Sequence, residues 1–418
     1  MGSTAVFSDD VKGDVSWLDD TFVKKVLQRM NGDTEVSVLH LHIAMATLPG
    51  ENYFSLMYRV HVEFSRGGEP MESMFFIVKT LPESEVVQKM VLNCGIFSRE
   101  TSVYSSLLPA LLALLDNRAP GCFPQFAAKG LYYEVSPVHL LAMEDLKASG
   151  FSTACRQQGL DLTHCRLVME TLGRFHGASA VLSMCQPGIV APFLFNPFTI
   201  TDNGELHRLV VNTVSALSTE VERWAGYEAC GRKLGRLSGK FFKKVVHAMS
   251  RDESSRSSFS VINHLDLWVN NIMFSYSGGQ PAAVRFVDFQ MPYVTSPVID
   301  LLYFLYTSPS PEVRAAHKDD LLTWYHASLS DTLHKLGHPA PYPTLQELLN
   351  EMERREFYGL FAACSILPFV LCRLGHVPAM QDVIADTPTI DMHAFYSHDY
   401  IIEIKKMLQV FDAKGFLD

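Results

Sequence analysis

A histidine, an aspartate and an asparagine stand at the spacing H-x-D-x-x-x-x-N, as His264, Asp266 and Asn271. A second aspartate, Asp288, follows in the pair D-F after a segment that reads as a β-hairpin. Phosphoryl transfer to a hydroxyl needs one carboxylate to meet that hydroxyl, with an amide and a second carboxylate to hold Mg²⁺ on the phosphates. The spacing therefore predicts Asp266 as the catalytic residue and Asn271 and Asp288 as metal ligands. A polar loop with two unrelated aspartates is the alternative, and the intervening hairpin argues against it.

A lysine and a glutamate form the second candidate pair. Lys79 closes the third predicted strand, and Glu100 lies on the following helix between the apolar residues Phe97 and Tyr104. Glu100 falls on or beside the apolar stripe, where a carboxylate needs a cationic partner. Kinases hold the α- and β-phosphates of ATP with such a Lys–Glu pair. A surface lysine and an exposed helix glutamate are the structural alternative.

The third candidate is the turn between the first two predicted strands, residues 48–55. Kinases cover the nucleotide phosphates with backbone N–H groups of this turn. Gly50 is its one glycine, so the motif alone would equally suit an ordinary hairpin. Counted with the other motifs, the turn predicts nucleotide contacts from Asn52, Tyr53, Phe54 and Ser55.

Residues near the catalytic loop are expected to support it. Asp300 lies in the first turn of an apolar helix and is predicted to brace the backbone of the loop, and His264 is given a similar bracing role. His176 is more typical of a satisfied core histidine than of a catalytic one. Trp268 is predicted to form a wall of the acceptor pocket, with Leu265 on the same side because it precedes Asp266.

Hydrophobic periodicity divides the chain into two parts. The first part reads as five antiparallel strands with a helix over 84–115 inserted after the third, and Pro109 is expected to end or break that helix near Leu108. The predicted strands are 36–48, 53–64, 74–78, 130–135 and 138–143.

The second part is mainly helical. Helices are predicted at 162–184, 205–224, 234–249 and 398–411, with further helix starts at Ser310-Pro311 and at the capping box Thr344–Glu347. A hairpin is predicted from 271–276 and 283–289. The fold class is therefore α+β, with an N-terminal lobe (1–143), a hinge (144–147) and a helical C-terminal lobe (148–418).

Composition limits the classes of function. The 418 residues are 48% hydrophobic and 19% charged, with a formal net charge of −10, which argues against a general nucleic-acid or anionic-membrane binder. The 8 cysteines form no C-x-x-C pair, which indicates free thiols in a reducing compartment. No signal peptide and no apolar run of about 20 residues is present, so a cytoplasmic monomer is expected.

Together the motifs resemble the protein-kinase-like fold in its small-molecule branch of aminoglycoside and choline kinases. Within that branch they are most similar to the ecdysteroid kinase-like (CHK-type) family of arthropods. Five strings between residues 35 and 305 carry the resemblance: G-E-N-Y at 50–53, F-I-V-K-T-L-P at 76–82, L-A-M-E-D-L at 141–146, D-L-W-V-N-N at 266–271 and V-D-F-Q at 287–290.

The resemblance implies ATP and Mg²⁺ as cofactors. The roles that it implies are phosphate binding by Lys79 and Glu100, adenine binding at a hinge of Glu144, Asp145 and Leu146, acceptance of the hydroxyl proton by Asp266, and Mg²⁺ binding by Asn271 and Asp288. One position departs from the family, which usually has Gly or Asn where this chain has Leu265. A β-carbon there would narrow the acceptor side or alter the backbone angles of the loop.

The resemblance also implies a lipophilic alcohol as the acceptor. Ecdysteroids such as ecdysone or 20-hydroxyecdysone are the family's best-known substrates, phosphorylated on the C-22 hydroxyl to give an inactive conjugate. Kinases of hydroxylated xenobiotics and of choline or ethanolamine are the alternatives, and choline would need an aromatic cage. A catalytically inactive binding protein would be expected to have lost Lys79, Asp266, Asn271 or Asp288, and all four are present.

Overall fold

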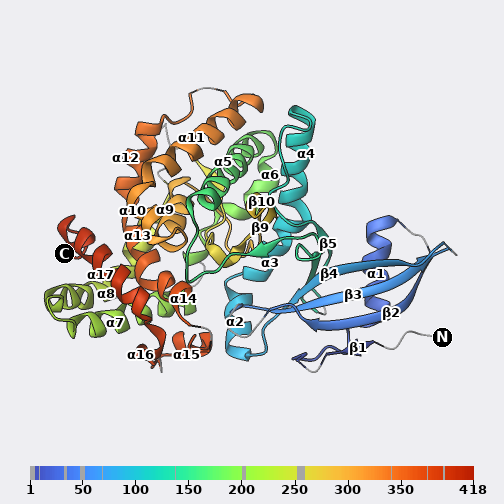
Figure 1. Ribbon diagram of the computed structural model, residues 1–418, viewed down its shortest axis with the longest axis horizontal. Coiled ribbons are helices and arrows are strands. Elements are labelled where there is room, and N and C mark those ends of the chain that lie inside the picture. The colour runs from blue at the N-terminus through green and yellow to red at the C-terminus, as the bar shows by residue number, and fades with distance from the viewer. Residues whose placement is uncertain are drawn as a thin grey trace.

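The computed structural model places a twisted sheet at one end of the molecule and a body of helices at the other (Figure 1). It describes residues 5–8, 10–32, 35–47, 52–67, 69–136, 138–199, 204–251, 259–339, 341–373, 375–388 and 391–418. Residues 48–51 of the predicted phosphate-covering turn lie outside the described residues. The predicted α+β class, with an N-terminal sheet and a helical remainder, is confirmed.

The sheet has six strands in the order β1-β2-β3-β4-β6-β5. Their bounds are Val6–Phe7 (β1), Val36–Met45 (β2), Leu56–Arg66 (β3), Glu72–Thr80 (β4), Gly130–Glu134 (β5) and Leu140–Glu144 (β6). The five predicted antiparallel strands are all present. The count of five was too low because β1 adds a parallel pairing to β2 that is only two residues long, too short to show an alternating pattern.

Alternation of buried and exposed side chains explains how the sheet meets its helix. On β3 the side chains of Tyr58, Val60, Val62 and Phe64 are buried, and they share a core with helix α1 (Asp20–Asn31). The opposite face of the sheet turns Lys79 of β4 inward, between Met57 of β3 and Leu141 of β6. Lys79 therefore lies near the end of a central strand that has a neighbouring strand on each side.

The predicted helix over 84–115 is divided differently from the expectation. It consists of α2 (Glu85–Asn93), α3 (Ile96–Ser102), a π-helical turn (Val103–Leu107) and α4 (Leu108–Arg118). The break falls at Gly95, which has a φ of 65°. Pro109 does not end the helix. In the wider π-helical turn before it, the N–H of Leu108 donates to the carbonyl of Val103, and Pro109 itself has no N–H that needs an acceptor.

The remainder is mainly helical, as predicted. Its helices are α5 (Leu162–Cys185), α6 (Pro187–Val190), α7 (Glu205–Glu222), α8 (Glu228–Met249), α9 (Val298–Thr307), α10 (Pro311–Ala316), α11 (Lys318–Lys335), α12 (Leu345–Arg355), α13 (Phe357–Phe361), α14 (Leu367–Leu371), α15 (Met380–Val383), α16 (Met392–Phe395) and α17 (His398–Ala413). The Thr344–Glu347 capping box is present, and Ser310 caps α10 through a hydrogen bond from Val313. A second π-helical turn, Ala362–Ile366, joins α13 to α14.

Two glycines let α5 and α11 approach closely. A β-carbon on Gly173 would lie 2.7 Å from the Tyr325 carbonyl, and one on Gly177 would lie 2.9 Å from Thr332. The close packing brings His176 against Tyr325, whose hydroxyl is 2.8 Å from Nδ1. His176 is fully buried and hydrogen-bonded, as expected of a core histidine.

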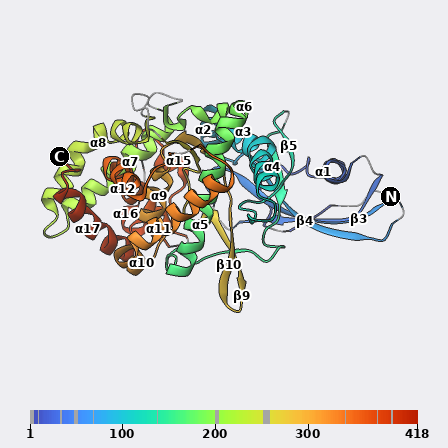
Figure 2. The same ribbon diagram turned by 90° about the horizontal axis from the view of Figure 1, so that it is seen from above.

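Short strands frame the loop that carries the predicted chemistry. They are β7 (Ser152–Thr153), β8 (Val261–Asn263), β9 (Ile272–Ser277), β10 (Gln280–Phe286) and β11 (Tyr293–Thr295). The predicted hairpin is formed by β9 and β10, which project from the helical body (Figure 2). The pairing of β8 with β11 fixes the start of the loop, and the hairpin fixes its end.

Within the described ranges no single helix is long and apolar enough to cross a bilayer, although α5 and the segment Pro187–Leu194, bent by 120° from it, pass that test as a pair.

Candidate active site

The backbone of the loop between β8 and β9 is held by Asp300. The Asp300 carboxylate is fully buried and accepts the N–H groups of His264 at 2.6 Å and Leu265 at 2.8 Å. His176 lies 3.1 Å from the same carboxylate. Asp300 is placed for this contact by the first turn of α9. The structure thus places Asp300 where a residue that braces the catalytic loop must lie.

His264 joins the loop to the segment after the hairpin. Its Nδ1 accepts the N–H of Asp266 at 3.3 Å, and its Nε2 lies 3.0 Å from the carbonyl of Val287. Accepting at Nδ1 leaves the proton on Nε2, which can then donate to that carbonyl. Burial lowers the pKa of His264 despite the opposing charges of Asp300 and Asp288, which favours the neutral ring.

Two residues of this region have strained backbones. Leu265 has a φ of 64° and Asp288 a φ of 67°, and they are the two non-glycine residues with positive φ in the described part of the chain. The left-handed conformation costs an L-residue about 1–2 kcal/mol, and such strain gathers at functional sites. Gly or Asn would adopt this conformation at Leu265 more easily.

The carboxylate of Asp266 is hydrogen-bonded through both oxygens. The hydroxyl of Tyr303 donates to Oδ1 at 2.6 Å, and Nδ2 of Asn271 donates to Oδ2 at 2.9 Å. Burial, with a smaller contribution from the charge of Asp288, raises the pKa of Asp266 to about 7. A carboxylate with such a pKa can accept a proton at neutral pH more readily than an ordinary one.

Asn271 and Asp288 are brought together by the hairpin, as its predicted geometry required. The N–H of Val287 donates to the carbonyl of Asn271 at 3.0 Å, which sets Asp288 beside Asn271. Both hydrogen bonds from the Asn271 amide nitrogen go to Asp266, so the amide oxygen is left for another partner. One amide oxygen and one carboxylate are ligands that suit Mg²⁺, which completes its shell with phosphate and water oxygens.

Lys79, Glu100 and Asp288 form a buried charge cluster. Nζ of Lys79 lies 2.7 Å from Oε2 of Glu100 and also contacts Oδ1 of Asp288, with the Lys79 and Glu100 side chains 3% and 2% exposed. Burial alone would lower the pKa of Lys79, but Asp288 and Glu100 raise it. Burial raises the pKa of Glu100 to about 7 against the opposing effect of Lys79. The second Glu100 oxygen, Oε1, is buried with no hydrogen-bond partner among the described residues.

Helix α3, which carries Glu100, is fixed to the helical body by the preceding residue. The guanidinium of Arg99 is buried and donates to the carbonyls of Pro292 at 3.0 Å and Phe195 at 2.9 Å. Glu100 is therefore held toward Lys79 by contacts on both sides of the helix.

A cleft between the sheet and the helical body encloses about 1030 Å³ of space, part of it open to solvent. Most of the predicted nucleotide and metal residues line it, namely Asn52, Lys79, Glu100, Glu144, Asp145, Leu146, Asn271 and Asp288. Arg59 of β3 pairs with the buried Asp145 carboxylate at 2.6 Å across one end of this cleft. We call it the nucleotide cleft, because the cationic Lys79 and the oxygen ligands of Asn271 and Asp288 line it, as binding of a nucleoside triphosphate with its metal would require.

The residues of the turn predicted to cover the phosphates do not all line the nucleotide cleft. Asn52 lines the nucleotide cleft, while Tyr53 and Phe54 do not. Ser55 lines neither cavity, and it accepts a hydrogen bond from the Asn52 amide at 2.7 Å. Ser55 therefore supports Asn52 and is not positioned to touch a ligand.

A second cleft of about 570 Å³, part of it open to solvent, is lined in part by Asp266. Its lining is mainly apolar and aromatic, with two carboxylates, those of Asp266 and Asp288. The lining residues are Asn52, Tyr53, Phe54, Leu209, Asp266, Trp268, Asn271, Asp288, Tyr303, Ile366, Phe369 and Met380. The rings of Tyr53 and Phe369 meet edge-to-face at 5.6 Å. We call this the acceptor cleft.

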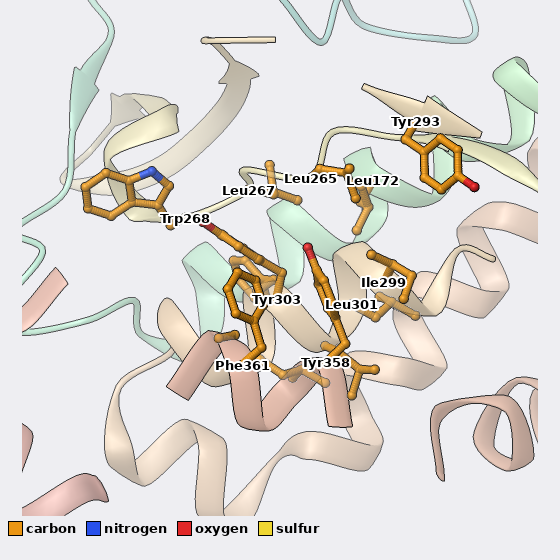
Figure 3. Packing of buried hydrophobic residues seen from close by; sticks show 14 of the residues in the cluster. Leu172, Leu265, Leu267, Trp268, Tyr293, Ile299, Leu301, Tyr303, Tyr358 and Phe361 are labelled. Carbon is orange, nitrogen blue, oxygen red and sulfur yellow. The ribbon is translucent and has the colours of Figure 1, made fainter. Parts of the chain in front are cut away.

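The two residues predicted for the acceptor pocket differ in position. Trp268 lines the acceptor cleft. Leu265 is not among the described residues that line either cleft, and its side chain is 4% exposed, packed into the core beneath the loop (Figure 3). The expected place of Leu265 on the acceptor side is therefore wrong, because its left-handed backbone turns the side chain inward.

Sequence reasoning missed Tyr303 and most of the acceptor cleft. Tyr303 follows Asp300 by three residues on α9, and that spacing places both on one helix face. The spacing could have indicated a second contact with the loop. Leu209, Ile366, Phe369 and Met380 come from three distant segments, and no local pattern distinguishes them from core residues.

The sequence model of the ecdysteroid kinase-like family matches residues 49–338, and no curated protein matches significantly. Among solved structures, the chain is similar to an ethanolamine kinase of Plasmodium vivax, with 11% identity, 88% of this chain and 81% of that chain covered, and a TM-score of 0.37.

Two further solved structures show a similar degree of likeness. One is an aminoglycoside phosphotransferase of Streptomyces rimosus in complex with ADP and streptomycin (12% identity, 84% and 98% covered, TM-score 0.31). The other is the amicoumacin kinase hAmiN in complex with AMP-PNP, Ca²⁺ and Ami (12% identity, 90% and 96% covered, TM-score 0.39).

The family match spans well over half of the 418 residues. It runs from residue 49 to just beyond α11, and so it includes Lys79, Glu100, the loop between β8 and β9, and Asp288. The chain therefore belongs to the ecdysteroid kinase-like family.

Proposed function

We propose that the protein transfers the γ-phosphoryl group of ATP to a hydroxyl of a lipophilic small molecule. The observation that carries this proposal is the meeting of the two clefts at Asn52, Asn271 and Asp288, which line both. A donor in one cleft and an acceptor in the other would thus face each other beside Asp266. Bound ATP with Mg²⁺ would supply the phosphoryl group and neutralise its charge.

Each of the site residues would have a separate role in phosphoryl transfer. Asp266 orients the acceptor hydroxyl and takes its proton as transfer proceeds. Lys79, fixed by Glu100, binds phosphate oxygens, and Asn271 and Asp288 offer oxygens to the metal. Residues 144–147 act as the hinge between a lobe of residues 1–143 and a lobe of residues 148–418, and the segment Glu144–Leu146, which lines the nucleotide cleft, would bind the base.

The apolar walls of the acceptor cleft favour a lipophilic acceptor. Leu209, Ile366 and Met380 offer no hydrogen bonds, and no Lys or Arg is among the described lining residues. With the family membership, this supports an ecdysteroid phosphorylated on its 22-hydroxyl, or a hydroxylated xenobiotic of similar polarity.

One observation favours choline or ethanolamine as a second candidate. Tyr53, Trp268 and Phe369 stand around the acceptor cleft, with Asp266 and Asp288 at its side. Aromatic faces near carboxylates are the usual surroundings of a quaternary ammonium group.

A direct test is to incubate the protein with Mg-ATP and a panel of acceptors, then measure the mass gain of one phosphoryl group. The panel contains 20-hydroxyecdysone, choline, ethanolamine and hydroxylated aromatic xenobiotics. Transfer to the steroid or xenobiotics supports the proposal, and transfer confined to choline or ethanolamine supports the second candidate.

The Asp266→Asn variant serves as the matched control. It should lose roughly 10²–10⁴-fold in turnover, the usual range for loss of general-base assistance. Its thermal stabilisation by Mg-ATP should match that of the wild type, since Lys79, Asn271 and Asp288 remain. A folded, ATP-binding variant within about tenfold of wild-type turnover would exclude Asp266 as the catalytic residue.

A further inference from the structure

Tyr303 makes the shortest described hydrogen bond to the Asp266 side chain. Its hydroxyl donates to Oδ1 at 2.6 Å, and its ring is 2% exposed. It also lines the acceptor cleft beside Asp266 and Trp268. None of the roles proposed above for phosphoryl transfer uses this residue.

The two bonds to Asp266 come from different elements and reach different oxygens. Tyr303 holds Oδ1 from α9, while Asn271 holds Oδ2 from the end of the loop. Two donors on two oxygens fix both the direction and the plane of a carboxylate. Each oxygen keeps further lone-pair capacity, so the fixed carboxylate can still accept the hydroxyl of an acceptor.

Helix α9 reaches the loop at two points one turn apart. Asp300 holds the backbone N–H groups of His264 and Leu265, and Tyr303 holds the side chain of Asp266. Since both contacts come from one rigid helix, the carboxylate and its backbone are positioned by the same element. Figure 3 shows Tyr303 on α9 beneath the loop, beside Tyr358.

We propose that Tyr303 is a positioning residue that orients the Asp266 carboxylate toward the acceptor cleft. This inference rests on the proposed phosphoryl transfer and adds a residue to it. A misplacement of a reacting group by about 1 Å can cost roughly 100-fold in rate. Loss of the Tyr303 hydroxyl should therefore lower kcat by roughly 10–100-fold, with the KM for ATP unchanged because Tyr303 does not line the nucleotide cleft.

Tyr358 provides a matched control. It lies on α13, it is fully buried, and its ring centroid is 6.3 Å from that of Tyr303. Its hydroxyl has no hydrogen-bond partner within the described part of the chain. Tyr358→Phe thus makes the same chemical change in the same cluster without touching Asp266, and kcat should stay within about twofold of wild type.

The experiment measures kcat and KM for wild type, Tyr303→Phe, Tyr358→Phe, Asp266→Asn and the double variant Tyr303→Phe/Asp266→Asn. The acceptor is the panel compound that the wild type phosphorylates most rapidly. If Tyr303 acts through Asp266, adding Tyr303→Phe to Asp266→Asn should lower kcat by less than about threefold further. A general packing defect would instead multiply the two losses.

The possible outcomes distinguish failure of the inference from failure of the proposed function. A low kcat for Tyr303→Phe alone, with no further loss in the double variant, supports the inference. Equal kcat for Tyr303→Phe and Tyr358→Phe, or fully multiplying losses, overturns it while leaving the proposed function in place. A folded wild type that phosphorylates no panel member overturns the proposed function and this inference together.

Discussion

Replacing Asp266 by Asn should make the protein more stable at alkaline pH while it removes activity. The folded-state pKa of Asp266 is about 7, raised mainly by burial from an ordinary value of 3.8. The folded state therefore holds this proton more tightly than the unfolded state. The stabilising contribution is complete below pH 3.8 and is lost as the pH rises through 7. An amide cannot ionise, so the variant does not undergo this loss.

The size of the effect follows from the shift. One pKa unit corresponds to about 1.36 kcal/mol, so the ionised carboxylate lowers the free energy of unfolding by up to about 4 kcal/mol above pH 7. Most of this loss, up to about 3 kcal/mol, falls between pH 5 and pH 8. These are upper limits, because Asp266 is only partly buried and water screens its charge.

The substitution also has a cost that does not vary with pH. The new amide oxygen can keep the bond from Tyr303, but the new amide nitrogen would face Nδ2 of Asn271, now 2.9 Å from Oδ2 of Asp266. Two donors facing each other cannot form a hydrogen bond, and the unsatisfied donor lowers the free energy of unfolding by about 1–3 kcal/mol. Asp266→Asn should therefore be near neutral or destabilising at pH 5 and more favourable at pH 8.

The assay is urea unfolding of wild type and variant at pH 5, 6, 7 and 8, followed by circular dichroism. The difference in the free energy of unfolding should move in favour of the variant by as much as about 3 kcal/mol across this range. Tyr358→Phe is the control and should show a constant difference, because the pKa of Tyr358 is raised well above 10 by burial. A difference between Asp266→Asn and wild type that is the same at every pH would refute the account of a desolvated Asp266.

Two further predictions concern neighbouring residues. Asp288→Ala should keep part of the thermal stabilisation by ATP but lose its magnesium-dependent part, because ligands stabilise the folded state by mass action and Asp288 is proposed to bind the ion. Scanning fluorimetry with ATP, with and without Mg²⁺, measures this stabilisation. An unchanged magnesium dependence would show that Asp288 does not bind the ion. Leu265→Gly should be less destabilising than Leu267→Gly by about 1–2 kcal/mol, because both remove a buried leucine but only Leu265 has positive φ. Equal losses in urea unfolding would show that the left-handed backbone at Leu265 carries no strain.

The catalytic loop was predictable because its signals are local. Asp266 and Asn271 are five residues apart, and a tight hairpin returns the chain to Asp288, so sequence spacing alone determines that they meet. Lys79 was predictable for a related reason: a strand alternates its side chains, and the residue at its end faces the helix that follows. Both arguments need only neighbouring elements.

Contacts between distant segments could not be derived in this way. Ile366 and Phe369 reach the acceptor cleft from the second π-helical turn and α14, about a hundred residues from the catalytic loop, and their apolar character equally suits a core. The inward turn of Leu265 depends on a φ of 64° that a leucine rarely adopts, so its position next to Asp266 wrongly indicated the acceptor side. Pro109 was misread because the π-helical turn before it removes the clash that proline usually causes.

The residues that line both clefts have a consequence for the hydrolysis of ATP in the absence of an acceptor. Asn52, Asn271 and Asp288 border both cavities, so a nucleotide in one and the contents of the other would meet the same three residues. If ATP binds as proposed while the acceptor cleft holds only solvent, a water molecule would take the position of the alcohol beside Asp266. We therefore expect slow ATP hydrolysis as a background reaction, which an apolar compound that fills the acceptor cleft without offering a hydroxyl should suppress.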